Sequence, residues 1–129
     1  MCLLDSVESW DEKTIHCRAM SHRSPDNPLR HGTGLSAMAG LEYAAQAMGV
    51  HVGLLNPEWS REGLVGYIGA VRDVTIGRAR LDDLPGHLTI EANRLLEGDN
   101  SFMYRFRLSA EDIEIMKGRA SIFLKQVEL

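Results

Sequence analysis

One carboxylate stands inside the longest apolar stretch of the chain, and this setting suggests chemistry. Between Leu35 and Leu55 almost every residue is Ala, Gly, Met, Leu or Val, yet Glu42 lies among them and Gln46 follows four positions later. In a helix this spacing places both side chains on one face, where an amide can orient a carboxyl group. Because apolar surroundings raise the pKa of a carboxyl group, Glu42 is a candidate general acid.

The same pattern has a simpler interpretation. Glu42, Tyr43 and Gln46 are also typical of a narrow stripe by which an otherwise buried helix meets solvent. A carboxylate in such a stripe needs no partner or function to offset the cost of burial. The pattern alone leaves both interpretations open.

The elements that must position Glu42 follow from hydrophobic periodicity. Residues 35–55 predict one long helix, since Pro28 precedes it and Asn56 and Pro57 follow it. Two-residue alternation predicts strands elsewhere. The expected strands are 6–10 and 15–19 as a hairpin, a long bent strand over 63–72 and 74–80, then 87–93, 101–108 and 113–125, the last with a bulge at Gly118. This order predicts a single α+β domain in which an antiparallel sheet curls round the helix.

Composition narrows the class of protein. The chain has 129 residues and a net charge of −4, so no basic field favours nucleic acid as a partner. Its two cysteines are too few for a disulfide framework, and its acidic start lacks the pattern of a signal peptide. Glu42, Gln46 and His51 inside the apolar stretch argue against a membrane span. We therefore expect a cytoplasmic protein.

Two segments resemble a known family. Residues 40–48, with the sequence GLEYAAQAM, are similar to the central helix of the bacterial hotdog-fold 3-hydroxyacyl-[acyl-carrier-protein] dehydratases. Residues 22–30, HRSPDNPLR, are similar to the branch of that family associated with aryl polyene biosynthesis. The resemblance implies a hotdog domain over residues 1–129 that forms a dimer, with the strand over 63–71 paired to its copy across a two-fold axis.

The resemblance also implies a reaction and its residues. Hotdog dehydratases remove water from a 3-hydroxyacyl chain on the phosphopantetheine arm of an acyl carrier protein, without a metal or organic cofactor. Glu42 takes the position of the acid that protonates the leaving hydroxyl group, with Gln46 as its orienting partner. Backbone N–H groups near Gly34 and Leu35 take the position of the donors that polarise the thioester carbonyl. Arg30 is a candidate for the phosphate of the carrier arm.

The base that completes this reaction is not at its usual position. The family places a histidine in a His-Phe-Pro segment fourteen residues before the acid, where this chain has Pro28. His22 lies in the matching loop and is the first candidate, and His31 is the second. A second hotdog subunit that supplies the histidine in a heterodimer is an equal alternative. The other histidines, His16, His51 and His87, are expected to be structural.

Two further functions fit the same features. The missing His-Phe-Pro segment also suggests a non-catalytic hotdog subunit that binds acyl carrier protein or stabilises an active dehydratase. A hotdog acyl thioesterase is a third possibility, because such enzymes also use a carboxylate on the helix. Arginines at positions 72, 78, 80 and 105 are either solvated strand faces or contacts for an acidic carrier protein.

Overall fold

One long helix and an antiparallel sheet form the part of the chain that the computed structural model describes, residues 2–32, 34–61 and 64–126. The helices are α1 (Gly40–Leu55) and the short α2 (Glu58–Arg61), with single 3-10 turns at η1 (Ser21–Arg23) and η2 (Ala37–Ala39). The strands are β1 (Ser6–Trp10), β2 (Thr14–Ala19), β3 (Leu64–Ile76), β4 (Leu88–Glu97), β5 (Ser101–Ala110) and β6 (Ile113–Gln126).

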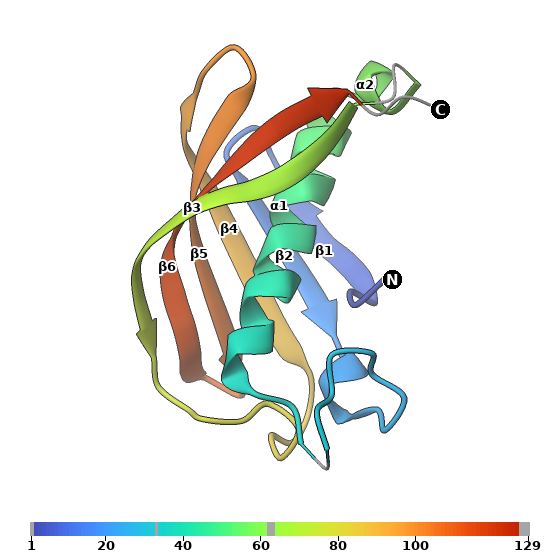
Figure 1. Cartoon of the computed structure of the whole chain (residues 1–129), viewed down its shortest axis with the longest axis vertical. Coiled ribbons are helices and arrows are strands. Elements are labelled where there is room, and N and C mark those ends of the chain that lie inside the picture. Colours follow the sequence, from blue (N-terminus) through green and yellow to red (C-terminus); the bar gives the residue numbers. More distant parts are fainter. Residues whose placement is uncertain (1, 33, 62–63, 127–129) are drawn as a thin grey trace.

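The sheet wraps around α1 in the arrangement of the hotdog fold, as the sequence predicted (Figure 1). Its strand order is β1-β2-β4-β5-β6-β3, and each pair of neighbours is antiparallel. α1 lies on the concave face of the sheet, and β3 and β6 curve over the C-terminal end of the helix. β1 and β3 are therefore the edge strands, while the dimer expected from the resemblance stays a prediction.

The core forms where one face of each strand meets one face of α1. On β5 the two-residue alternation is complete: Phe102, Tyr104, Phe106 and Leu108 are buried, whereas Arg105 and Arg107 are exposed. The helix contributes Tyr43, Ala44, Ala47 and Met48, none of which has accessible surface. Each large side chain buried in this way contributes about 1.5–3 kcal/mol to stability. In the described residues no helix is long and apolar enough to cross a membrane.

The helix begins later than the sequence predicted. We expected it to start at Leu35, but α1 starts at Gly40 after the 3-10 turn η2. The reason is a long-range pairing: the Leu81 N–H donates to the Leu35 carbonyl, and the Ala37 N–H donates to the Ala79 carbonyl, both at 2.9 Å. These bonds hold the chain before η2 extended, so the apolar run divides into a bridge and a helix.

Two features of the predicted strands are also wrong. The bent strand was expected to continue to Arg80, but β3 ends at Ile76. A bulge was expected in β6 at Gly118, but the register of β6 against β5 is unbroken there and shifts beyond Met116, where Ile115 and Met116 are both buried. Against β3 the register does shift opposite Gly118, and the extra residue lies in β3, between Arg72 and Thr75. Gly118 is needed for close packing, because a Cβ atom there would lie 2.9 Å from Cγ2 of Val74.

A buried histidine links α1 to the sheet. His51 has no accessible surface, its Nε2 lies 2.7 Å from the carbonyl oxygen of Asp11, and its Nδ1 lies 2.6 Å from the hydroxyl of Tyr104. A carbonyl can only accept, so Nε2 carries the proton in the neutral ring and Nδ1 accepts from Tyr104. This chain of bonds fixes the C-terminal half of the helix to β5 and to the β1–β2 turn.

We predict that acid destabilises the fold through its buried histidines. Burial lowers the pKa of His22 and His51 below the ordinary value of about 6.5. As pH falls through about 6.5, the unfolded chain binds protons that the folded chain does not, so stability decreases. Thermal unfolding measured from neutral pH to about pH 5 should show a falling midpoint. His51→Gln should weaken this dependence, whereas the exposed His31→Gln should not; a midpoint that stays level would contradict the prediction.

Candidate functional site

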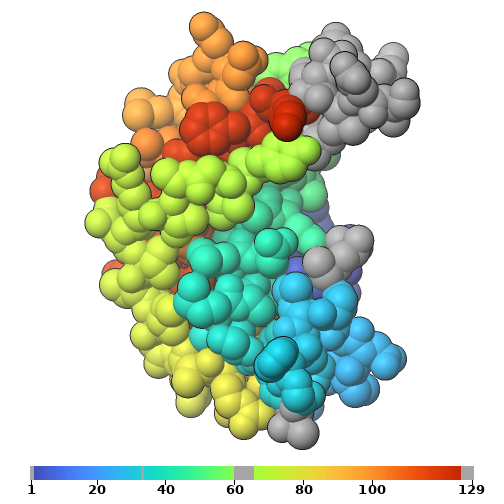
Figure 2. Space-filling view, in the orientation of Figure 1, coloured from blue at the N-terminus to red at the C-terminus, as the bar shows by residue number. Residues whose placement is uncertain are grey.

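A groove of about 850 Å³ runs along the one face of α1 that the sheet leaves uncovered. Its floor is a helical stripe spaced three or four residues apart: Glu42, Ala45, Gln46, Gly49, Val50 and Gly53. One wall is the N-terminal segment from Cys2 to Val7, and the other includes Trp59 and the β3 residues Gly66, Tyr67 and Ile68. Figure 2 shows a hollow beside α1, below β3 and above the loop that precedes the helix.

Glu42 lies in the first turn of α1 and contributes its side chain to this groove. The side chain is exposed, as in the solvent-stripe interpretation, and the burial that the general-acid interpretation requires is not found in the single chain. Tyr43 was grouped with Glu42 in the alternative solvent stripe, but it is fully buried. The stripe that faces the groove thus combines the polar Glu42 and Gln46 with small apolar residues.

The groove changes in character along its length. Along α1 the polar Glu42 and Gln46 come first, and Gly49, Val50, Val52 and Gly53 follow. The walls add the polar residues Cys2, Asp5, Ser6 and Tyr67 and apolar residues that include Trp59, Ile68 and Leu124. Such a site suits a ligand with a polar reacting end and an apolar tail. Among the described residues, no cluster of three or more His, Cys, Asp or Glu could hold a metal ion.

Gln46 has a defined contact that the sequence did not reveal. Its Oε1 accepts the backbone N–H of Leu3 at 2.8 Å, and the hydroxyl of Ser21 donates to the Leu3 carbonyl at 2.7 Å. Leu3 itself is buried in the core. These bonds hold the N-terminal segment against α1, so Gln46 helps to build the wall of the groove as well as its floor.

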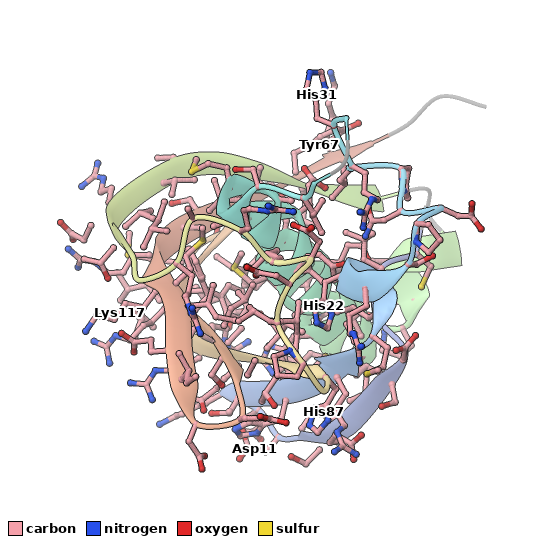
Figure 3. The ribbon with its side chains drawn as sticks, turned by 90° about the horizontal axis from the view of Figure 1, so that it is seen from below. Asp11, His22, His31, Tyr67, His87 and Lys117 are labelled. Atoms are coloured by element: carbon pink, nitrogen blue, oxygen red, sulfur yellow. The ribbon has the colours of Figure 1, made fainter. Side chains whose placement is uncertain are left out.

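The two histidines proposed as bases do not line the groove. His22 is fully buried, and its Nε2 lies 3.1 Å from the Leu84 carbonyl, which must accept its proton. Its Nδ1 is buried without a partner among the described residues. His31 is exposed and projects from the loop at the edge of the molecule (Figure 3). Neither imidazole is placed beside Glu42 within the single chain.

The backbone donors proposed before the helix are already engaged. The Leu35 N–H donates to Oδ1 of Asp82 at 2.8 Å, and the Gly34 N–H donates to the His31 carbonyl at 3.3 Å. Arg80 pairs with Asp82, and this guanidinium together with the Leu35 N–H holds the pKa of Asp82 well below its usual range. The carboxylate of Asp82 therefore accepts the Leu35 N–H that was expected to donate to a thioester oxygen.

The loop before α1 is organised by a polar cluster around Tyr43. The amide nitrogen of Asn27 donates to the Tyr43 hydroxyl at 3.0 Å and to the Ser21 carbonyl at 2.8 Å, and the hydroxyls of Ser21 and Tyr43 are 2.7 Å apart. Asn27 Oδ1 also accepts the Leu29 N–H. Arg30 is partly buried, and its Nη1 lies 3.4 Å from the Ser24 carbonyl. The loop is thus docked on the helix by contacts that its composition alone did not predict.

Sequence reasoning missed most of the groove walls. Asp5 and Ser6 belong to a segment with no motif, and Trp59 lies between the predicted helix over 35–55 and the predicted strand from 63, where no element was expected. Asp5 is a second carboxylate that lines the groove, and its Oδ2 accepts the Met20 N–H at 2.6 Å. Only the position of Glu42 and Gln46 on one helix face could be found from spacing.

Comparison with known proteins finds one matching family model and several solved structures with a similar fold. A model of the ApeP-like family, described as ApeP dehydratase, matches residues 1–128. The solved dehydratase heterocomplex ApeI:P from Xenorhabdus doucetiae superposes with a TM-score of 0.85 at 22% identity, over 97% of this chain and 84% of that one. No curated protein matches the chain.

Other solved structures share the fold at lower identity. A putative thioesterase from Lactococcus lactis has a TM-score of 0.70 at 11% identity, over 97% of this chain and 94% of that one. A hypothetical thioesterase from Streptococcus pneumoniae, solved with coenzyme A, has a TM-score of 0.65 at 15% identity, over 96% and 88%. The same architecture is therefore found in proteins described as dehydratases and as thioesterases.

We predict that Gln46→Ala loosens the N-terminal wall of the groove. The substitution leaves the buried Leu3 N–H without its acceptor, which costs about 1–3 kcal/mol. Urea unfolding should show this loss, and hydrogen exchange at the Leu3 amide should become faster. Gln46→Glu keeps an acceptor oxygen and should behave more like the parent chain. Unchanged exchange in Gln46→Ala would show that the wall is held by other contacts.

Proposed function

Since the chain belongs to the ApeP-like dehydratase family, we propose that it acts in the dehydration of 3-hydroxyacyl chains carried on acyl carrier protein. The observation that carries the proposal is the place of Glu42 on the floor of a long groove whose lining is mostly apolar. A base removes a proton from C2, the C3–O bond breaks, and Glu42 protonates the departing hydroxyl group. The products are a trans-2-enoyl thioester, still on its carrier, and water.

The base in this proposal comes from a second hotdog subunit. His22 was the alternative, but its imidazole is buried, bonded to Leu84 and absent from the lining of the groove. The similar structure from Xenorhabdus doucetiae is described as a dehydratase heterocomplex, which supports a shared site. A partner over the groove would also shield Glu42 from water.

Acyl carrier protein is the proposed source of the substrate, and the outer face of the sheet supports this choice electrostatically. In register across neighbouring strands, Arg105 faces Arg119, Arg119 faces Arg72, and Arg107 faces Lys117. Like charges in such positions destabilise a sheet. Asp73 and Glu114 pair with some of these cations, whereas no described residue pairs with Arg72 or Arg105. Lys117 points outward in Figure 3. An acidic carrier protein would offset this repulsion.

We predict that Glu42→Gln abolishes dehydration. An amide cannot deliver the proton, and loss of a general acid lowers the rate about 100- to 10,000-fold. The assay follows the loss of water from 3-hydroxyacyl-carrier protein by mass spectrometry, with the chain alone and mixed with a second hotdog subunit that carries a His-Phe-Pro segment. Glu58→Gln, on the exposed surface of α2, is the matched control and should keep full activity.

Full activity of the Glu42→Gln variant in the complex would instead favour the non-catalytic alternative. The engaged N–H groups of Gly34 and Leu35 and the buried His22 are the observations on its side. In that case the chain would stabilise an active partner or bind the carrier protein. Dehydration by the chain alone would contradict the need for a partner's base.

The thioesterase alternative rests on the structural neighbours and makes an opposite prediction. Hydrolysis of an acyl thioester releases a free thiol, whereas dehydration leaves the thioester intact. We expect no release of thiol from a 3-hydroxyacyl thioester, measured with a thiol-reactive dye, while enoyl product accumulates. Thiol release that depends on Glu42 would assign the groove to hydrolysis.

A further inference from the structure

Two glycines of α1, Gly49 in its interior and Gly53 in its last turn, have no structural reason to be glycine. A glycine within a helix is about 0.5–1 kcal/mol less favourable than alanine. Neither Gly49 nor Gly53 has a positive φ, and a Cβ atom at either position would meet no atom within 4 Å. Gly40 differs, because its Cβ would lie 2.9 Å from Leu108. The helix therefore keeps two unfavourable residues that its own packing does not require.

Both glycines lie on the floor of the groove, and their effect is to leave it open. Gly49 is one turn beyond Ala45 and Gly53 is one turn further, on the apolar side of Glu42 and Gln46. With a rise of 1.5 Å per residue, the floor from Glu42 to Gly53 is about 16 Å long. A side chain at either glycine would project into this space and narrow it.

Trp59 marks the far end of the groove. The indole packs at a centroid distance of 6.0 Å from the ring of Phe102, and the backbone N–H of Trp59 donates to the Asn56 carbonyl at 3.0 Å. The side chain is partly buried against the core and also lines the groove. It is thus a supported wall rather than a free surface group.

We infer that Gly49, Gly53 and Trp59 set the length of the acyl chain that this chain accepts. The inference rests on the proposed function, in which Glu42 marks the reacting end of the substrate. From that end an extended acyl chain lies over the two glycines and stops at the indole of Trp59. Val50, Ile68 and Leu124 line the groove with apolar surface, so transfer of the acyl tail from water into the groove is favourable.

A helix of a partner subunit is the competing occupant, because glycines four residues apart also permit close helix packing. The size and the lining of the site favour the acyl chain. The groove lies between the N-terminal segment on one side and β3 and Trp59 on the other, and most of its lining residues are apolar. Its volume of about 850 Å³ lies in the range of small-molecule sites.

The test measures binding rather than turnover. In a Trp10→Phe background the indole of Trp59 alone reports on the groove, since the exposed Trp10 does not line it. The probes are saturated acyl thioesters of N-acetylcysteamine, from butanoyl to dodecanoyl. We expect the Kd to fall about fourfold for each added methylene, which corresponds to about 0.8 kcal/mol, until the tail reaches Trp59 and the Kd levels off.

Substitution of either glycine should lower the chain length at which the Kd levels off. In Gly53→Val the Kd should level off at a shorter chain, and in Gly49→Val at a chain shorter still, while butanoyl binding is kept. Valine resembles glycine in helix propensity, so the fold should persist in both. Leu54→Val changes an exposed position of α1 outside the groove and should leave the series unchanged.

The other possible outcomes distinguish a failure of this inference from a failure of the proposed function. A Kd that does not depend on chain length, or variants that follow the parent series, would overturn the inference even if dehydration is observed. If the Kd falls with chain length as expected but no dehydration is observed, the inference is supported and the proposed function is contradicted. If the valine variants change the oligomeric state and no series is seen, the glycines belong to a subunit interface and the inference is wrong.

Discussion

The rotational setting of α1 is the constraint on which the site depends. Two polar side chains on the buried face fix it: Tyr43 bonds to Ser21 and Asn27 near the helix start, and His51 bonds to Tyr104 and the Asp11 carbonyl two turns later. A buried polar group is costly unless it is bonded, so a helix turned about its axis would lose both sets of partners. Because the buried face is fixed, the stripe from Glu42 to Gly53 must face the groove.

The sequence predicted the architecture well because most of the elements can be recognised from their local hydrophobic periodicity. Alternation on β5 and the apolar run of α1 each identify an element without knowledge of the others. The start of α1 could not be found in this way, since it depends on the pairing of Leu35 with Leu81, far along the chain. The same holds for the point along β6 at which the buried side chains change from one alternation to the other, which is set by the register against β5.

For the site, spacing identified the floor and failed at the walls. Glu42 and Gln46 were found because a helix places residues four apart on one face. Asp5, Trp59 and Tyr67 reach the groove only through tertiary structure, and nothing in their neighbouring residues signals it. The sequence left the exposure of Glu42 undecided, because the apolar composition of α1 does not say which of its faces the sheet will cover.

The five histidines show why a site completed by a second chain is physically reasonable. His22 and His51 are buried, and each donates an N–H to a backbone carbonyl, so these groups stabilise the fold. On the outer surface His16 pairs with Glu91, and His87 accepts from Arg18. His31 is left on an exposed loop tip. A base beside Glu42 within this chain would require one of these rings to leave its present position.

The edge strand β3 offers the place where such a second chain would add. An edge strand of thirteen residues presents unpaired backbone groups, which proteins usually cover or distort. The distortions in β3 are confined to its later part, where the register against β6 shifts after Ile68 and again after Arg72, and where Asp73 has a φ of 55°. The part before Ile68 is regular, and Gly66, Tyr67 and Ile68 also form a wall of the groove. A strand added there would bring its neighbouring loops over the groove, so the proposed pairing of subunits and the completion of the site around Glu42 would be one event.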